Sequence, residues 1–390
     1  MAETLREIVL GFLKVGATGY GGPAIMGVMQ AEFQERRQWV SRPRFVEGLS
    51  LVNMLPGATA VELAIFLGYC RRGWVGGVLA GLCFMLPAFA IMLALAAAYA
   101  ALGVSPLVRG ALYGLGPVVL GVFLVAVYRL CRSALRSLGH GAIAAGAAVA
   151  AVVSPLGTVS ILLTAGAVGL LAFHARRAGA IALLVLACGL GLFHAASWAR
   201  PAPPTAGPAV ATPAALADVA VLFVTIGAFT FGGGLSMLAF LEDEVVTRRG
   251  WLTPREFIDG LALGQLTPGP ILMVAAYVGY KVHGVTGAAV GALAIFLPSF
   301  ALILSALPVF DRVRTAAWAK AILQGIGPGV IGVLVVSLGH MAPHAVPDLF
   351  AALVLILTVV AVLAVRLAPL HAVLGGALVG VVRSRLVATP

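Results

Sequence analysis

The chain has 390 residues, of which 61% are hydrophobic and 10% are charged, and its mean hydropathy is +1.08. A soluble protein of this length cannot bury that much apolar surface, so the composition excludes a soluble enzyme and predicts an all-α polytopic membrane protein. The formal net charge of +11 comes from small basic clusters between apolar segments, which is typical of membrane-protein loops. We therefore expect a lipid bilayer, and no nucleic acid, as a partner.

Thirteen apolar segments follow one another along the chain. We expect helices throughout, with about 11–13 membrane segments, because the backbone must satisfy its own hydrogen bonds in lipid. A Pro- and Ala-rich linker at 200–215 divides the chain into two halves. The segments lie near 7–30, 45–69, 74–102, 107–128, 138–153, 156–173 and 179–198, and then near 216–241, 257–280, 285–307, 321–341, 349–365 and 370–382.

The second half repeats the first at a spacing of 211 or 212 residues. Phe12 and Trp39 recur as Phe223 and Trp251, and many glycines and prolines keep the same spacing. Such a run of matched residues indicates an internal duplication. The predicted domains are therefore two homologous helical membrane repeats, at 1–199 and 216–390.

Each repeat contains a Pro-Gly break inside an apolar segment. The breaks are Asn53-Met54-Leu55-Pro56-Gly57 and Gln265-Leu266-Thr267-Pro268-Gly269-Pro270. Proline removes a backbone donor and glycine relaxes the backbone, so we expect both helices to be interrupted. Matching breaks in two halves indicate a transporter's binding site, although a packing kink is the alternative.

We expect an anion at these breaks, because proline would start a new half-helix whose free N–H groups carry the positive end of the helix dipole. Hydroxyl and amide side chains beside the breaks would add donors. The candidate binding residues are Asn53, Pro56, Gly57, Thr59, Gln265, Thr267, Pro268 and Gly269.

The orientation of the repeats depends on the path of the broken segments 45–69 and 257–280. Seven full crossings in the first half would invert the second half, whereas doubling back would leave six crossings and parallel halves. The basic loop residues favour doubling back in the first half but not in the second. The sequence leaves both arrangements open.

A glycine-rich motif precedes each break. It reads Thr18-Gly19-Tyr20-Gly21-Gly22-Pro23 in the first repeat and Thr230-Phe231-Gly232-Gly233-Gly234 in the second. A potassium-channel filter is disfavoured because the second copy replaces Tyr20 with Phe231. The glycines instead permit close approach to a ligand, or simply to a neighbouring helix. Gly21, Gly22, Gly232 and Gly233 are the further binding candidates.

An arginine pair beside a tryptophan follows each glycine motif. The pairs are Arg36-Arg37 and Arg248-Arg249. They are typical of an anchor at the membrane interface. The functional alternative is a pair that gathers anions, because guanidinium groups bind oxyanions through a planar fork of donors.

Three carboxylates lie in or beside the broken segments. Glu47 and Asp259 occupy equivalent places, and Glu62 lies deeper, where the second repeat has Val274. A buried acid in a membrane is costly and often carries protons, so all three are candidates for coupling, although Glu47 and Asp259 are also typical interface residues. We identify no catalytic motif, metal site or cofactor site, and predict that the chain is not an enzyme.

In the first half, Gly-Gly-Pro, Arg-Arg-x-Trp, Asn-Met-Leu-Pro-Gly and Gly-Tyr-x-x-x-Gly follow in order. The second half has Gln-Leu-Thr-Pro-Gly-Pro and Phe-Leu-Pro-Ser-Phe. This pattern resembles the chromate ion transporter family in its long form. The resemblance implies chromate export across the inner membrane, sulfate as a chemical look-alike, and repeats of opposite orientation, which favours full crossing. One departure is Ala58, where the second half has Pro270.

The resulting prediction is a multi-pass secondary transporter of the bacterial inner membrane, with broken helices and inverted repeats. It would export a tetrahedral divalent oxyanion, chromate, and so confer chromate resistance. Protons and a second copy of the chain, in a homodimer, are further expected partners. The alternatives are a transporter of sulfate or another anion and, with less support, a channel or a membrane protein without transport activity.

Overall fold

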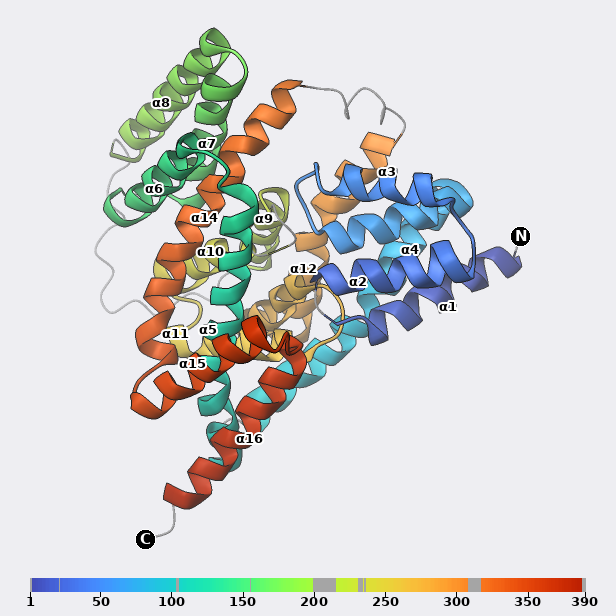
Figure 1. Cartoon of the computed structure of the whole chain (residues 1–390), viewed down its shortest axis with the longest axis vertical. Helices are drawn as coiled ribbons and strands as arrows, with labels where there is room; N and C mark the ends of the chain where they lie inside the picture. Colours follow the sequence, from blue (N-terminus) through green and yellow to red (C-terminus); the bar gives the residue numbers. More distant parts are fainter. Residues whose placement is uncertain are drawn as a thin grey trace. The chain divides into compact units, whose positions relative to one another are not determined.

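The computed structural model describes residues 2–20, 22–102, 105–154, 156–198, 215–230, 234, 236–307 and 317–387. Every regular element in these ranges is helical (Figure 1), which confirms the all-α class. Gly21, Gly232 and Gly233, and the linker apart from Ala215, lie outside the described residues.

The helices follow the repeat. In the first half they are α1 (Ala2–Thr18), α2 (Gly22–Met29), η1 (Gln30–Arg36), α3 (Arg42–Val52), α4 (Thr59–Leu102), α5 (Pro106–Ala134), α6 (Leu138–Val153), α7 (Thr158–Phe173) and α8 (Arg176–Trp198). In the second half they are α9 (Leu216–Ala228), α10 (Ser236–Leu241), η2 (Glu242–Arg248), α11 (Pro254–Leu266), η3 (Ile271–Met273), α12 (Val274–Ala306), α14 (Ala317–Ala345), α15 (Leu349–Ala364) and α16 (Pro369–Val387).

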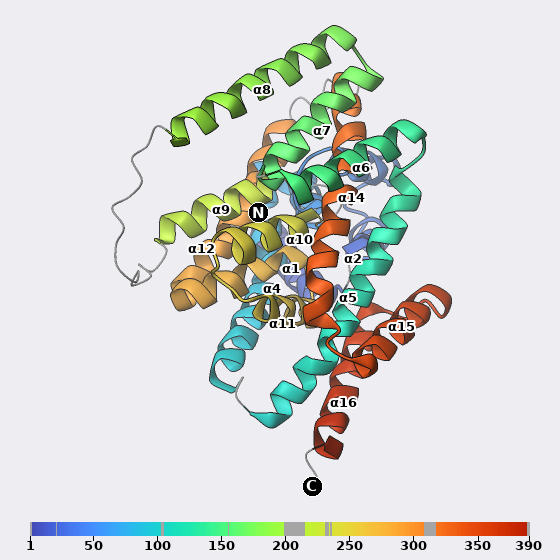
Figure 2. The same cartoon turned by 90° about the vertical axis from the view of Figure 1, so that its left-hand side faces the viewer.

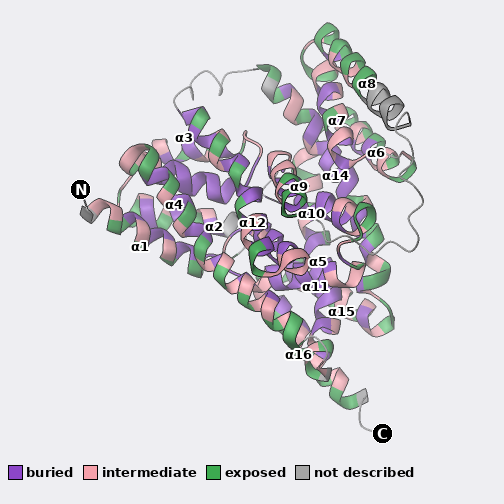
Figure 3. Ribbon diagram, turned by 180° about the vertical axis from the view of Figure 1, so that it is seen from behind, coloured by how far each residue is buried: buried purple, intermediate pink, exposed green. Residues whose placement is uncertain are grey.

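Within the part of the chain that the structure describes, four helices are long and apolar enough to cross a bilayer: Thr59–Leu102, Leu107–Ala134, Ile271–Ala306 and Lys320–Ala345. Large apolar side chains also face outward on shorter helices, such as Leu184 on α8 and Leu357 on α15, which are 65% and 68% exposed. Figure 3 shows exposed residues along α8 and α16 and also on the later part of α4. Exposed apolar side chains on this scale are what a lipid-facing surface requires.

The longest helices, α4 and α12, each fold back on themselves at a glycine. The backbone leaves the helical region at Gly73 (φ 58°) and at Gly284 (φ 60°). Gly68 packs against Gly76 across the first bend, and Gly279 packs against Gly287 across the second. Each helix therefore has two antiparallel legs, at 59–71 and 74–102 in α4, and at 274–282 and 285–306 in α12.

A second reversal occurs at each predicted break, so that α3 runs antiparallel to the first leg of α4. Arg44 stacks on the ring of Phe66 at 5.4 Å, while Gly48, one turn further along α3, lies against the same ring. In the second repeat, Tyr277 donates a hydrogen bond to the Glu256 carbonyl at 3.0 Å and packs on Gly260. We call these units the break hairpins, residues 42–71 and 254–282.

The break hairpins reverse direction before either leg is long enough to cross a bilayer. Their helical legs are 9 to 13 residues long, at most about 20 Å at the usual rise, which is too short for about 30 Å of hydrocarbon. Each begins with a strong helix start: the Ser41 hydroxyl accepts a hydrogen bond from the Arg44 N–H, and Thr253 forms a capping box with Glu256. The expectation of a full crossing is therefore wrong for these segments.

The glycine motif is also the tip of a hairpin. In the first repeat, α1 runs antiparallel to α2 and η1: Phe12 stacks on Phe33 at 4.3 Å, and Lys14 pairs with Glu32 at 3.2 Å. In the second repeat α9 packs on α10 in the same way. We call these units the leading hairpins, residues 2–36 and 216–248. The predicted segment 7–30 is thus two short helices.

The two repeats have opposite orientation, because the equivalent second legs of α4 and α12 pack antiparallel. Gly77 of α4 lies against Leu304 of α12, and Gly81 of α4 lies against Phe300 of α12. Residue numbers therefore increase along α4 in the direction in which they decrease along α12. Equivalent helices related by an axis along the membrane normal would run parallel. Antiparallel packing of equivalent spans is the mark of inverted repeats.

The chain forms two compact units, and each contains parts of both repeats. One comprises Met1–Arg129, Leu216–Arg314 and Ser337–Pro390, and the other comprises Leu130–Ala215 and Thr315–Val336. In the second unit, α7 and α8 run side by side (Figure 2), and Gly169 of α7 packs closely on Gly325 of α14. The break hairpins and leading hairpins all belong to the first unit.

Candidate functional site

The tips of the hairpins meet in pairs, and each pair joins the two repeats. The Gly57 N–H, in the first break, donates a hydrogen bond of 2.7 Å to the Thr230 carbonyl at the second leading tip. In the equivalent contact, the Gly269 N–H donates a hydrogen bond of 2.7 Å to the Gly19 carbonyl at the first leading tip. Four interrupted helices therefore converge about the pseudo-twofold axis of the inverted repeats. We call this group of residues the tip site.

The first break is polar and closely packed. Gly57 has φ 141°, and a Cβ added there would collide with Glu62 Oε1 and with Ser299 Oγ. The next residue, Ala58, donates its N–H to Ser299 Oγ at 2.8 Å. Glu62 is completely buried in the first turns of α4, and neither carboxylate oxygen has a hydrogen-bond partner among the described residues.

The second break has the same path but an apolar lining. Gly269 has φ 97°, and a Cβ added there would lie 2.8 Å from the Ala88 Cβ. Ala88 is the equivalent of Ser299, and the fully buried Val274 is the equivalent of Glu62. The two copies of the break therefore differ in chemistry although their backbones match.

The sequence predicts that each proline starts a half-helix and that the N–H groups beside it are free. The structure differs in both respects. Pro56 precedes the start of α4 at Thr59, and Pro268 is separated from α12 by η3, so both prolines lie in the tips rather than in a first helical turn. The N–H groups of Gly57 and Gly269 are bonded to carbonyls of the opposite repeat. The donors left for an anion are the first-turn N–H groups of α4, which have no carbonyl partner within the helix.

The polar side chains of the breaks lie at the tips but are differently placed. Asn53 is exposed and donates its amide to the Leu49 carbonyl at 2.7 Å. Gln265 is half-buried near the end of α11. Thr59 and Thr267 are buried, and the Thr267 hydroxyl donates back to Leu263 at 2.8 Å. Gly22, the remaining described candidate, begins α2.

The arginine pairs lie at the base of the leading hairpins, at the opposite end from the tips. Arg37 pairs with Glu32 at 2.8 Å and lies 5.5 Å from the Trp39 ring centre, whereas Arg36 is 71% exposed and approaches Glu32 at 3.4 Å. Burial alone would raise the pKa of Glu32, but hydrogen bonds from Arg37 and Lys14 outweigh it and lower that pKa. Arg37 is therefore held in place, and Arg36 is the more available cation.

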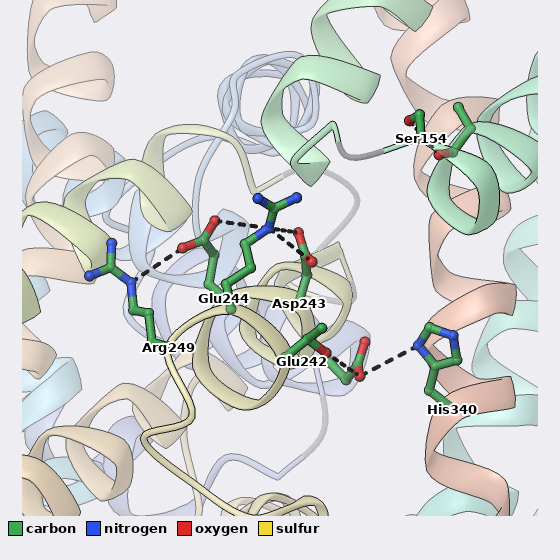
Figure 4. A network of polar contacts seen from close by, with 9 residues as sticks. Ser154, Glu242, Asp243, Glu244, Arg249 and His340 are labelled. Atoms are coloured by element: carbon green, nitrogen blue, oxygen red, sulfur yellow. Dashed lines mark hydrogen bonds and ion pairs between the residues drawn. The ribbon is translucent and has the colours of Figure 1, made fainter. Parts of the chain in front are cut away.

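The second pair is held by acids of its own hairpin (Figure 4). Arg248 Nε lies 3.1 Å from Asp243 Oδ2, and Arg249 Nε lies 3.3 Å from Glu244 Oε2. Arg249 also stacks on the neighbouring tryptophan at 5.0 Å. Beside them Glu242, which is buried, faces His340 of α14 at 3.6 Å. These contacts suit an interfacial anchor, and an anion-gathering role stays a prediction.

The equivalent carboxylates Glu47 and Asp259 have unequal surroundings. Glu47 is 38% exposed and pairs with Arg44 at 3.0 Å. Asp259 is buried, lies 3.4 Å from Arg255 Nε, and accepts a hydrogen bond of 3.1 Å from the Tyr99 hydroxyl. Both are thus partnered outside the tips, whereas Glu62 is the candidate that lies in the tip site.

Sequence reasoning missed Ser299 and the tip carbonyls of Gly19 and Thr230. The signal for Ser299 was available, since the repeats differ at both Glu62/Val274 and Ser299/Ala88. The contact itself was not, because Ala58 and Ser299 are 241 residues apart. Among the described residues, no group of three or more His, Cys, Asp or Glu side chains could hold a metal ion.

Comparison with known proteins gives a consistent result. The family model described as chromate transporter matches residues 6–196 and 217–381. A probable chromate transport protein of Synechococcus elongatus is 33% identical over 363 residues, covering 92% of this chain and 90% of the relative. Chromate transport proteins of Cupriavidus metallidurans (32%, covering 97% and 93%) and Pseudomonas aeruginosa (34%, covering 87% and 82%) are also similar. No solved structure matches the chain.

Proposed function

Because the chain belongs to the chromate transporter family, we propose that it carries chromate out of the cytoplasm across the bacterial plasma membrane. It is a multi-pass membrane transport protein rather than an enzyme. Export would lower the cytoplasmic chromate load and so confer resistance. The homodimer stays a prediction.

The observation that carries the proposed site is the meeting of four interrupted helix ends. Two pairs of tips from inverted repeats are joined by the equivalent bonds Gly57–Thr230 and Gly269–Gly19. Interrupted helices at a repeat interface supply N–H groups and dipole ends that bind ions, and small movements of one repeat against the other change access to such a site. A tetrahedral dianion beside the first turn of α4 suits these donors.

Sulfate is the second candidate cargo, since it shares the charge and tetrahedral shape of chromate. Backbone N–H groups bind either anion without distinguishing the central atom. Competition for uptake would decide whether the tip site distinguishes chromate from sulfate. If the two anions compete equally, the natural cargo depends on which of them is more abundant in the cytoplasm.

The arginine pairs would raise the local anion concentration at the membrane surface. Roughly 20 Å of helix separates Arg36 from the tip of its hairpin. That distance exceeds the screening length in salt solution, so Arg36 would act on anions at the membrane surface and not on an anion held in the site. We therefore propose that Arg36, rather than Arg37, gathers anions. A separate proposal is that transport of the anion is coupled to protons.

The test is chromate uptake into everted membrane vesicles that contain this protein. Saturable uptake above empty vesicles, reduced in Gly57→Ala but retained in Gly27→Ala, supports export through the tip site. Gly27 is a suitable control because a Cβ there meets no atom within 4 Å. Uptake equal to that of empty vesicles, in membranes shown to contain folded protein, would exclude chromate as cargo.

A further inference from the structure

We propose that Glu62 must take up a proton before the oxyanion can occupy the tip site, so that one proton accompanies each anion across the membrane. This inference rests on the proposed function and gives the coupling a place, a stoichiometry and a sign. It concerns one break only, because the second break has no carboxyl.

Glu62 is a buried acid with no partner that offsets the cost of burying its charge. It is 0% exposed, and neither oxygen has a hydrogen-bond partner. The polar group that faces it is the Ser299 hydroxyl of α12, and no charged or titratable side chain among the described residues of α1, α2, α3, α11 or α12, which pack on α4, acts on it. Phe231 to Gly233 and Leu235, which lie outside the described residues, are uncharged in the sequence.

An ionised Glu62 and a dianion cannot share the tip site. Both would be directed at the first-turn N–H groups of α4, and their charges repel strongly where water is excluded. A protonated Glu62 removes the repulsion and leaves those N–H groups to the anion. Anion binding and protonation therefore favour each other, and reciprocity requires that the effect is equal in both directions.

The collision geometry at Gly57 places the carboxyl within the moving part of the site. Glu62 Oε1 and Ser299 Oγ occupy the space where a side chain at Gly57 would lie, and the Gly57 N–H is hydrogen-bonded to the Thr230 carbonyl of the opposite repeat. Any rearrangement of the first break changes the surroundings of Glu62. The proton thus binds a Glu62 oxygen on the side where the anion enters and leaves on the side where the anion is released.

The difference between the repeats sets the stoichiometry. Val274 and Ala88 take the places of Glu62 and Ser299 beside the second break, so no proton-carrying side chain occupies that equivalent position, and the buried Asp259 of the same hairpin is partnered by Arg255 and Tyr99 away from the tips. One proton moves with one dianion in the same direction, and the complex carries a single net negative charge. Outward movement of that charge is favoured by a membrane potential that is negative inside.

The test measures the dissociation constant of radiolabelled chromate on purified protein from pH 5.5 to pH 8.5. In wild type, chromate binding should weaken as the pH rises past the range in which Glu62 loses its proton. The dissociation constant should increase by up to about tenfold per pH unit, as one linked proton requires. Glu62→Gln, a neutral isostere, should lose that slope, whereas Glu62→Asp should keep a slope. The control Glu35→Gln removes an exposed carboxyl of η1 and should behave as wild type.

The comparison between variants isolates the side chain, because the protonation of chromate itself is the same in every sample. In liposomes, the reversal potential should report one charge per anion for wild type and two for Glu62→Gln. A wild-type pH slope in Glu62→Gln would overturn the inference, as would loss of all binding in a Glu62→Gln protein with unchanged thermal unfolding, or coupling to sodium instead of protons. Wild type that binds neither chromate nor sulfate at any pH would instead overturn the proposed function.

Discussion

At the scale of single residues, Gly57 is the most constrained position of the tip site. Its positive φ disfavours any side chain, and the space beside its α-carbon is occupied by Glu62 and Ser299. Proline and glycine in the sequence were enough to predict that the helix is interrupted here. They were not enough to predict the partners, because Thr230 and Ser299 come from the other repeat.

Gly57→Ala should therefore destabilise the protein by roughly 2–5 kcal/mol, which combines backbone strain with overpacking. The control is Gly250→Ala, because Gly250 has φ 60° but nothing within 4 Å of an added Cβ. Only backbone strain remains there, and about 1–2 kcal/mol is expected. Thermal unfolding in detergent measures both, and equal losses would contradict the packing at Gly57.

The arginine pair offers a second residue-scale prediction. Arg37→Ala leaves the buried Glu32 without its shortest partner, at 2.8 Å, and should cost about 1–3 kcal/mol. Arg36→Ala removes a largely exposed cation and should change stability by less than about 0.5 kcal/mol. At low ionic strength, however, Arg36→Ala should take up chromate more slowly than wild type. Equal stability losses in the two variants would show that the pair acts as one anchor.

At the scale of elements, the reversal of short helices explains why the sequence misjudged the membrane path. Apolar periodicity predicts a helix but does not distinguish a leg that crosses from a leg that returns. The apolar pattern predicts one segment over 7–30, whereas the structure ends α1 at Thr18 and begins α2 at Gly22. The sequence predicts seven apolar segments in the first half. If both hairpins return to the side from which they start, five segments are left to cross, and an odd number of crossings is what inverted repeats need.

The start of α15 gives a pH-dependent prediction at this scale. Asp348 caps the helix through the Ala351 N–H at 2.8 Å and joins α5 and α16 through Tyr113 at 2.6 Å and Arg383 at 2.7 Å. The hydrogen bond from Tyr113, followed by the one from Ala351, lowers the pKa of Asp348 to about 2. Its stabilising effect is therefore complete above the unfolded pKa of about 3.9 and is lost as the pH falls towards about 2.

Asp348→Asn should accordingly lower the melting temperature at pH 6, and the difference from wild type should shrink between pH 4 and pH 2.5. Thermal unfolding in detergent across this range measures the effect. A difference that stays constant down to pH 2.5 would show that the ionised carboxylate does not provide the stabilisation.

At the scale of the whole chain, the inverted repeat predicts that equivalent surface positions of the two repeats face opposite sides of the membrane. Glu35 and Thr247 are exposed, equivalent residues at the bases of the two leading hairpins. In a background without the four native cysteines, a membrane-impermeant maleimide should label Glu35→Cys from one side of the membrane and Thr247→Cys from the other. Labelling of both from the same side would contradict the antiparallel packing of α4 and α12.

The duplication, the helical class and the positions of both breaks were predictable from the sequence, because each depends on local composition and spacing. The pairing of tips was not, since it depends on how two repeats fold around each other. The unequal chemistry of the breaks lies between these cases: the substitutions Glu62/Val274 and Ser299/Ala88 are visible in the sequence, but their contact is a property of the fold.

Protection of the tip site from chemical labelling by the substrate is the most direct test that the tips hold the oxyanion. Asn53→Cys places a thiol at the exposed edge of the first break, and Trp74→Cys, 54% exposed in wild type, places one beside the bend between the two legs of α4, at the opposite end of the break hairpin. Chromate and sulfate should slow maleimide labelling of Asn53→Cys in a concentration-dependent way and leave Trp74→Cys unchanged. Unchanged labelling at both positions, in protein that still transports chromate, would place the anion elsewhere.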